Sequence, residues 1–322
     1  MNVIVLGKSG GMGGWAENVC RAFEKEGHNT YAFSINGNSR FQHLKYKLYK
    51  SKQTINDKYT VARFEKFISK RPVDICVSLC GYTIPAAVYE CLRRQYPECL
   101  NIAWVGEKFN ETSRYSASLF DQIYYTDTQF IIDHRELGFE SQVNYMPHAV
   151  DTEIFSVSNQ TRIPKMLFVA NRTALREQIV GSIKSPIQVN GRGWRRYRHH
   201  SQHSVSPHRV SLAKLPELYR NYLAVLNVKN ENHMVNGLNQ RSFEPYGCKT
   251  LVVHDAVSDV ERCFEPGNEI LVYKDENELN GIYERILKDP EYAKKIAEAG
   301  FNRVNASHTY KHRIAEFVRA AN

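Results

Sequence analysis

The sequence predicts an α/β protein with two halves, each a parallel sheet covered by helices on both faces. Two observations carry this prediction. Short apolar runs alternate with stretches of helical period along the chain, and a polar stretch interrupts the alternation at residues 151–164. That stretch ends at Pro164 and predicts a hinge or linker. The chain has 322 residues, 42% of them hydrophobic, which is enough for two domains of ordinary size.

The N-terminal domain is expected to span residues 1–150. A buried strand over residues 2–6 leads into a glycine-rich turn at residues 7–14, and a helix follows from Trp15 until Gly27 ends it. Further apolar runs predict strands over residues 30–34, 73–79, 100–105, 123–125 and 143–145.

The C-terminal domain is expected to span residues 165–305. Its strands are predicted over residues 166–170, 187–189, 223–227, 250–253 and 269–272, with a clear helix over 279–287. Residues 306–322 are expected to form a final helix that packs back towards the N-terminal domain.

The composition argues against membrane and secreted classes. The longest apolar runs have five or six residues, whereas a membrane span needs about 20, and no signal-peptide core follows the first strand. The seven cysteines show no zinc-like spacing and are expected to be buried thiols in a reducing compartment. We therefore expect a cytoplasmic protein.

The net charge of +9 is concentrated in two segments. Residues 40–71 hold ten Lys and Arg against two acidic residues, and residues 195–209 hold four Arg and no acid. Outside these segments the chain is slightly acidic. A charge gathered in this way predicts an anionic partner at those places.

The turn at residues 7–14 follows a strand and opens a helix. Its glycines let a ligand approach backbone N–H groups at the helix N-terminus, so Gly13 and Gly14 are candidate donor contacts. The spacing matches neither the dinucleotide fingerprint nor the phosphate loop of nucleotide hydrolases. Simple tight-turn packing is the alternative explanation.

Residues 239–255 carry the most specific pattern: Asn-Gln-Arg-Ser-Phe-Glu-Pro-Tyr-Gly-Cys-Lys-Thr-Leu-Val-Val-His-Asp. This pattern resembles glycosyltransferases of the GT-B fold, of the group-one type and in particular the CgeB-like, spore-maturation branch. Other segments resemble the family in the same order along nearly the whole chain: residues 11–15, 146–155, 168–172, 190–194, 264–273 and 308–313. The resemblance implies two Rossmann-like domains that face each other across a cleft and transfer a sugar from a nucleotide-sugar donor, by default a UDP-sugar.

The resemblance also implies roles for three residues. Glu244 corresponds to the family's carboxylate that binds the ribose hydroxyls of the donor, a role that suits an acceptor of two hydrogen bonds. Arg172 and Arg241 are expected to bind the diphosphate, and Arg241 to stabilise the charge that develops on the leaving group.

Glu107 follows the strand at residues 100–105, where ligands approach a parallel sheet, and is the candidate catalytic base. A solvated loop glutamate is the alternative. No acidic pair follows a strand in a position to bridge a metal to the diphosphate, and the four His of residues 195–209 have no standard ligand spacing, so we expect no metal.

The acceptor is predicted from charge. Cations and aromatic residues interleave in the first basic segment, which favours a polyanion such as a modified base in DNA, as in phage DNA-modifying glycosyltransferases. The alternatives are an envelope glycan, lipid carrier or protein at an anionic membrane, or a nucleic-acid-binding protein without catalysis. The candidate acceptor-side residues are Arg40, Lys45, Lys47, Lys50, Lys52, Arg195, Arg196 and Arg198.

Overall fold

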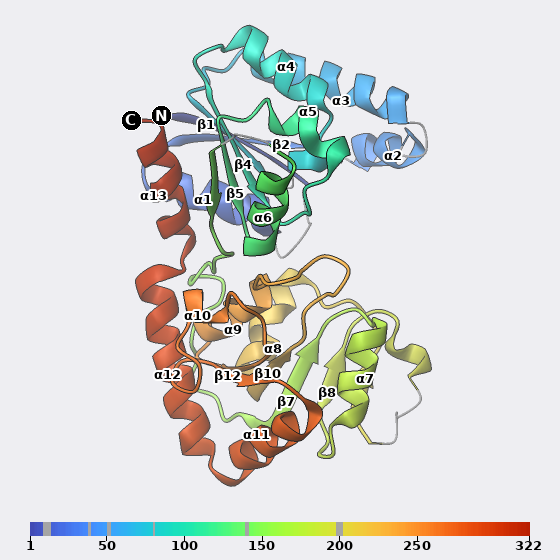
Figure 1. The fold of residues 1–322 in the computed structure, drawn as a ribbon, viewed down its shortest axis with the longest axis vertical. Helices are drawn as coiled ribbons and strands as arrows, with labels where there is room; N and C mark the ends of the chain where they lie inside the picture. The colour runs from blue at the N-terminus through green and yellow to red at the C-terminus, as the bar shows by residue number, and fades with distance from the viewer. Residues whose placement is uncertain (9–13, 38–39, 50–52, 80, 139–141, 198–201) are drawn as a thin grey trace. The chain divides into compact units, whose positions relative to one another are not determined.

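The computed structural model describes residues 1–8, 14–37, 40–49, 53–79, 81–138, 142–197 and 202–322. The chain divides into two compact units (Figure 1). The first unit is Met1–Met146 together with Tyr310–Asn322, and the second is Pro147–Thr309. Each unit contains a six-stranded parallel sheet, so the predicted α/β class with two parallel sheets is confirmed.

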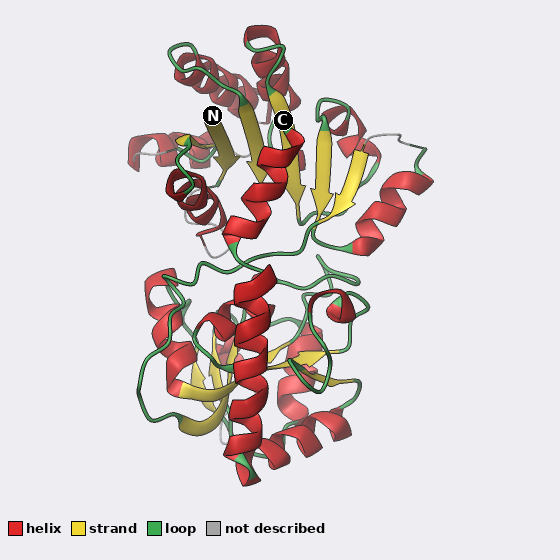
Figure 2. Cartoon of the chain, turned by 90° about the vertical axis from the view of Figure 1, so that its left-hand side faces the viewer, coloured by secondary structure: helices red, strands yellow, loops and turns green. Residues whose placement is uncertain are grey.

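The first unit has the strand order β2-β1-β3-β4-β5-β6. Figure 2 shows these strands as arrows that all point the same way. The strands are β1 (Asn2–Gly7), β2 (Asn29–Ser34), β3 (Ile75–Leu79), β4 (Leu100–Val105), β5 (Gln122–Tyr125) and β6 (Gln142–Tyr145). The helices are α1 (Trp15–Lys25), α2 (Arg40–Tyr49), α3 (Gln53–Ile68), α4 (Ala86–Gln95), α5 (Arg114–Ala117) and α6 (Thr128–Glu136).

Helices cover both faces of this sheet because successive strand side chains point to opposite sides. On β4, Ala103 and Val105 belong to the core formed with α3 and α4. Trp104 lies on the other face, where its ring packs against Trp15 of α1 at a centroid distance of 4.9 Å. Because both faces of such strands are buried, apolar residues follow one another along them, and each strand appears in the sequence as a short apolar run.

The last helix, α13 (Tyr310–Ala320), belongs to the first unit although it follows the second in sequence. Phe317 packs against Trp104 at 5.9 Å and against Tyr124 at 5.4 Å. Lys311 adds an ion pair to Glu26, just after α1, at 2.8 Å. The final helix, expected to pack towards the N-terminal domain, thus completes one face of its sheet.

The second unit has the strand order β12-β11-β10-β7-β8-β9. Its strands are β7 (Ile163–Val169), β8 (Gln188–Asn190), β9 (Ser204–Ser206), β10 (Tyr222–Asn227), β11 (Leu251–Asp255) and β12 (Leu271–Tyr273). Its helices are α7 (Ala174–Ser182), α8 (Leu215–Asn221), α9 (Glu244–Gly247), α10 (Val260–Cys263), α11 (Glu276–Lys288) and α12 (Pro290–Ser307). The order reverses between β7 and β10, and the carboxyl edge at such a reversal is where ligands of open parallel sheets bind.

Two features of the second unit differ from the sequence prediction. Residues 195–209 were expected to be a loop, but they contain the edge strand β9, whose polar Ser-Val-Ser sequence lacks the apolar run of a central strand. The expected linker at residues 151–164 belongs to the second unit, and β7 begins within it. Arg162 fastens this stretch: its guanidinium donates to four main-chain carbonyls and to the Thr250 hydroxyl.

Candidate functional site

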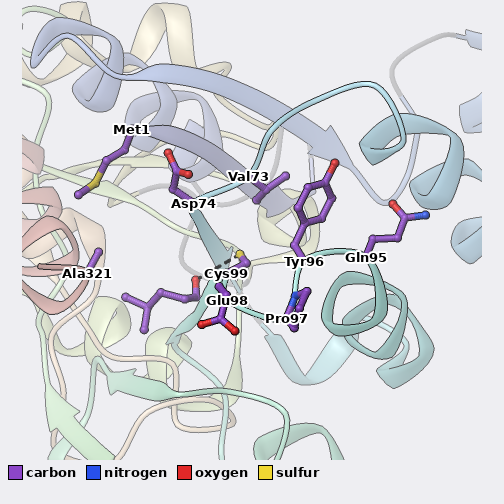
Figure 3. Close-up of a pocket in the computed structure, with 10 residues that line it drawn as sticks. Met1, Val73, Asp74, Gln95, Tyr96, Pro97, Glu98, Cys99 and Ala321 are labelled. Atoms are coloured by element: carbon purple, nitrogen blue, oxygen red, sulfur yellow. Dashed lines mark hydrogen bonds between the residues drawn. The ribbon is translucent and has the colours of Figure 1, made fainter.

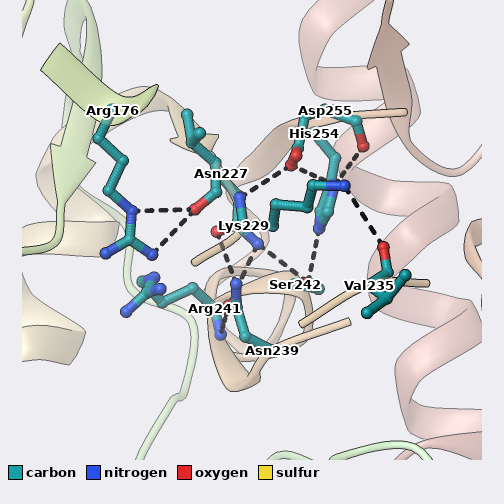
Figure 4. A network of polar contacts seen from close by, with 10 residues as sticks. Arg176, Asn227, Lys229, Val235, Asn239, Arg241, Ser242, His254 and Asp255 are labelled. Atoms are coloured by element: carbon teal, nitrogen blue, oxygen red, sulfur yellow. Dashed lines mark hydrogen bonds and ion pairs between the residues drawn. The ribbon is translucent and has the colours of Figure 1, made fainter. Parts of the chain in front are cut away.

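The candidate site lies in the second unit at the carboxyl edge of its sheet, where the strand order reverses. Arg176 on α7 joins the loops that follow β7 and β10. Its guanidinium donates to the carbonyl of Asn171, after β7, at 3.2 Å and to that of Val228, after β10, at 3.0 Å. Figure 4 shows this corner of the unit.

A buried polar network holds the segment that carries Arg241 (Figure 4). Asn227, the last residue of β10, donates to the Ser242 Oγ at 2.9 Å, and the Ser242 Oγ lies 2.9 Å from the Nε2 of His254 on β11. The Asn239 Oδ1 accepts from the main-chain N–H of Arg241 at 2.9 Å. This arrangement fixes the short turn Gln240–Ser242 against the sheet.

His254 has an orientation set by Asp255. Its Nδ1 lies 2.7 Å from the Asp255 carbonyl and 3.1 Å from the Asp255 Oδ1, both of which are acceptors, so Nδ1 carries a hydrogen. Ser242 and His254 are fully buried, so this Ser–His–Asp arrangement does not reach a substrate and serves to hold the loop in place.

Arg176 and Arg241 bring two positive charges together. Arg176 is 3% exposed, and its pKa is lowered to about 10 by burial and by the nearby charge of Arg241, which the carboxylates of Glu231 and Asp255 offset only in part. Within the described part of the chain, no hydrogen bond or ion pair holds the Arg241 guanidinium. Two guanidinium groups placed in this way favour a bound anion.

Glu244 begins α9 and is buried, with 3% of its surface exposed. Burial raises the pKa of its carboxyl to about 7, although Arg241 and a hydrogen bond from Tyr219 oppose that shift. The Tyr219 hydroxyl donates to the Glu244 Oε2 at 3.3 Å. Beside the bond from Tyr219, the carboxyl oxygens have further lone pairs that can accept hydroxyl hydrogen bonds.

Arg172 follows β7 and is partly exposed, and its guanidinium pairs with Glu177 of α7. The loop after β8 packs directly beside it. Gly191 has φ 150°, and a Cβ there would lie 2.0 Å from the Ala170 carbonyl oxygen. Glycine is therefore needed for the Arg172 N–H to reach the Arg192 carbonyl at 2.9 Å.

The first unit holds the predicted residues Gly13, Gly14 and Glu107. Gly14 has φ 74° and precedes α1, as a glycine turn at a helix start requires, whereas Gly13 lies outside the described residues. Glu107 follows β4 at the carboxyl edge, and its charge helps to raise the pKa of the Tyr82 and Tyr125 phenols, for which burial is the main cause.

Those phenols form a small buried cluster. The Tyr82 and Tyr125 hydroxyls are hydrogen-bonded to each other, and the Tyr125 hydroxyl lies 3.0 Å from the Nδ1 of His134 on α6. Burial, together with Arg135, lowers the pKa of His134 to about 4. Glu107 therefore lies near neutral phenols, and the Asp133 carboxylate acts on Tyr125 as well.

The basic residues predicted to bind the acceptor belong to both units. Lys45 lies on α2, with its Nζ 4.7 Å from the Phe41 ring centroid, and Arg195 and Arg196 are exposed in the turn Trp194–Arg196 of the second unit. Arg40 and Lys47 lie on α2, but their side chains are not described. Lys50, Lys52 and Arg198 lie outside the described residues.

A pocket opens at the opposite edge of the first sheet (Figure 3). It is lined at the amino ends of the strands by residues that include Asp74, Tyr96 and Glu98. Ligands of parallel sheets bind at the carboxyl edge, so this pocket is not the candidate site. Among the described residues, no group of three or more His, Cys, Asp or Glu could hold a metal ion. No described helix is long and apolar enough to cross a membrane.

Sequence and structure comparisons show what this chain is similar to. Residues 165–319 match the protein family described as "Glycosyl transferase-like". A search of curated proteins finds no match. Sucrose-phosphate synthase from Thermosynechococcus elongatus has a TM-score of 0.73 at 13% identity, covering 99% of this chain and 98% of its own. A glycosyltransferase from Rickettsia africae has a TM-score of 0.73 at 12% identity, covering 99% and 97%.

A third solved structure adds a ligand to this comparison. The Anabaena protein HepE, in complex with UDP-glucose, has a TM-score of 0.69 at 11% identity, covering 99% of this chain and 100% of its own. The whole chain therefore has the GT-B fold of known glycosyltransferases, and the glycosyl transferase-like family model covers most of the second unit and nearly all of α13. The GT-B fold that the resemblance implies is confirmed by these structures.

Proposed function

We propose that this protein transfers a sugar from a nucleoside diphosphate sugar, and that the second unit binds the donor. One observation carries the proposal: the guanidinium groups of Arg176 and Arg241 lie together at the carboxyl edge of the second sheet. The charge of Arg241 also acts on the buried carboxyl of Glu244. A diphosphate supplies the negative charge that two neighbouring guanidinium groups lack, and a ribose supplies hydroxyls for the carboxyl group.

In this proposal Arg176 and Arg241 bind the diphosphate, and Arg172 assists from the loop after β7. Negative charge grows on the diphosphate as the sugar leaves, so the fixed guanidinium groups stabilise the transition state more than the ground state. The Asn227–Ser242–His254 network supports this role because it fixes the turn that carries Arg241 before any ligand binds. UDP is the default nucleotide, as in the ligand of HepE.

Glu107 and Gly14 are proposed to act from the first unit. Glu107 is the candidate base that removes a proton from the acceptor, and its place at the carboxyl edge after β4 supports this assignment. Gly14 leaves backbone space at the start of α1, where the donor could approach. The CgeB-like branch and a modified base in DNA remain the narrower proposals for family branch and acceptor. Their support is the charge of residues 40–71 and the motifs of the sequence.

A screen of thermal unfolding tests donor binding. A UDP-sugar at about 100 times its Kd is expected to stabilise the native state by about 2.7 kcal/mol, which raises Tm by several degrees. Uridine is the matched control, since it lacks the diphosphate and should raise Tm less at the same concentration. If UDP-, ADP- and GDP-sugars all leave Tm unchanged, the donor site is wrongly assigned.

Transfer is also proposed to proceed without a divalent metal. Guanidinium groups neutralise the diphosphate in this proposal, and a metal is not needed for that purpose. Turnover measured with excess EDTA should therefore equal turnover without it. Loss of activity on chelation that manganese or magnesium restores would contradict this part of the proposal.

A further inference from the structure

We propose that α2 docks the first unit on an anionic lipid surface. The docking face consists of Phe41, Leu44 and Leu48, here called the α2 stripe. The exposed fractions of these side chains are 65%, 55% and 63%. The proposal concerns a surface of the first unit and does not depend on the proposed donor site.

The α2 stripe follows helical spacing. Positions 41, 44 and 48 are separated by three and four residues, so they share one face of the helix Arg40–Tyr49. The neighbouring helix α3 buries its apolar residues Phe64 and Ile68 fully in the core. The α2 stripe thus has the periodicity of a face that packs against something, but in this chain it faces solvent.

Positive charge accompanies the stripe in the sequence, and one lysine lies beside it. Residues 40–71 carry a net charge of +8, and Lys45, on α2 itself, lies over the Phe41 ring at 4.7 Å and near the Tyr59 ring at 5.7 Å. An apolar face flanked by lysines is the pattern of a helix that lies in the plane of a membrane interface. The apolar side chains enter the acyl boundary while the lysines remain at the anionic headgroups.

A lipid surface explains both features, whereas a nucleic acid explains one. Phosphates would neutralise the lysines, and a base could stack on the Phe41 ring. The two leucines have no aromatic face for stacking and would stay exposed on a duplex backbone. The apolar character of Leu44 and Leu48 therefore favours lipid over the DNA predicted from charge alone.

Co-sedimentation with vesicles tests the proposal with the full chain. The wild type should bind vesicles of phosphatidylcholine mixed with phosphatidylglycerol at low salt, and bind phosphatidylcholine alone far more weakly. Changing Phe41, Leu44 and Leu48 together to Ser should weaken binding about tenfold or more, because the apolar contact is lost. Changing Ile132, Val157 and Val235 to Ser is the matched control, since these are also exposed apolar residues, and it should change nothing.

A second variant separates charge from apolar contact. Changing Lys45, Lys47, Lys50 and Lys52 to Gln should weaken binding to the anionic vesicles and reduce its salt dependence. Both variants should keep the wild-type circular dichroism and Tm, which would show that any loss of binding is not due to unfolding. Wild type that does not bind anionic vesicles at low salt overturns the proposal. So does a stripe variant that binds vesicles as wild type does. Salt-dependent binding to duplex DNA, unchanged in the stripe variant, together with no vesicle binding, would assign the surface to nucleic acid.

Discussion

Replacement of Arg241 by alanine is expected to lower kcat by about 30-fold to about 1,000-fold, which corresponds to about 2–4 kcal/mol of transition-state stabilisation. The reason is that Arg241 presents a guanidinium without a hydrogen-bond or ion-pair partner in the described part of the chain, next to buried Arg176. Turnover of a UDP-sugar, with release of UDP as the readout, measures the effect.

A measurement of stability and a second arginine variant serve as controls. The variant loses repulsion from Arg176 and also loses the favourable charge of Arg241 on Glu244, so it should unfold close to the wild-type temperature. Arg262→Ala removes an exposed arginine from the same unit and should leave kcat unchanged. Wild-type turnover in Arg241→Ala would remove this residue from the site.

Replacement of Glu244 by glutamine is expected to weaken donor binding about tenfold to about 100-fold while it stabilises the protein above neutral pH. Loss of hydrogen bonds to a charged acceptor accounts for the first effect, at about 1.5–3 kcal/mol. The second effect follows from the pKa of Glu244, which burial raises from 4.5 to about 7 in the native state.

The raised pKa of Glu244 determines how the stability of the native state changes with pH. The stability that the raised pKa provides is fully present below pH 4.5, and it is lost as the pH rises towards 7 and the buried carboxyl must ionise. Glutamine does not ionise, so the stability of the variant relative to wild type should increase between pH 5 and pH 8, by up to about 3 kcal/mol. Thermal unfolding across that range measures it. A difference between the two proteins that does not change with pH would show that Glu244 is ionised at all these pH values or is exposed in solution.

Much of the fold could be predicted because each strand is a short apolar run. Buried parallel strands have no polar face, so residues 100–105 were assigned with the observed bounds of β4. The edge strand β9 was not predicted because its Ser-Val-Ser sequence contains no apolar run. The role of Arg162 was hidden as well, because nothing in a polar stretch reveals that one side chain will satisfy four distant carbonyls.

Two residues of the candidate site could be predicted because a sequence motif contains them. The motif at residues 239–255 pointed to Arg241 and Glu244, and the structure brings the charge of Arg241 close enough to act on the buried carboxyl of Glu244. Arg176 and His254 were missed. In the sequence, Arg176 looks like an ordinary arginine of a helix. Its importance comes from its hydrogen bonds to the carbonyls of Asn171, after β7, and Val228, after β10. His254 ends an apolar strand, and its bond to Ser242 depends on the packing of two segments.

Titration calorimetry of UDP and uridine tests the central claim most directly. If the paired guanidinium groups of Arg176 and Arg241 form the diphosphate site, UDP should bind the wild type far more tightly than uridine does, and Arg241→Ala should lose about tenfold or more of that difference while its affinity for uridine stays the same. Equal affinities of the wild type for UDP and uridine would contradict the account, because the second unit would then have no site for a diphosphate.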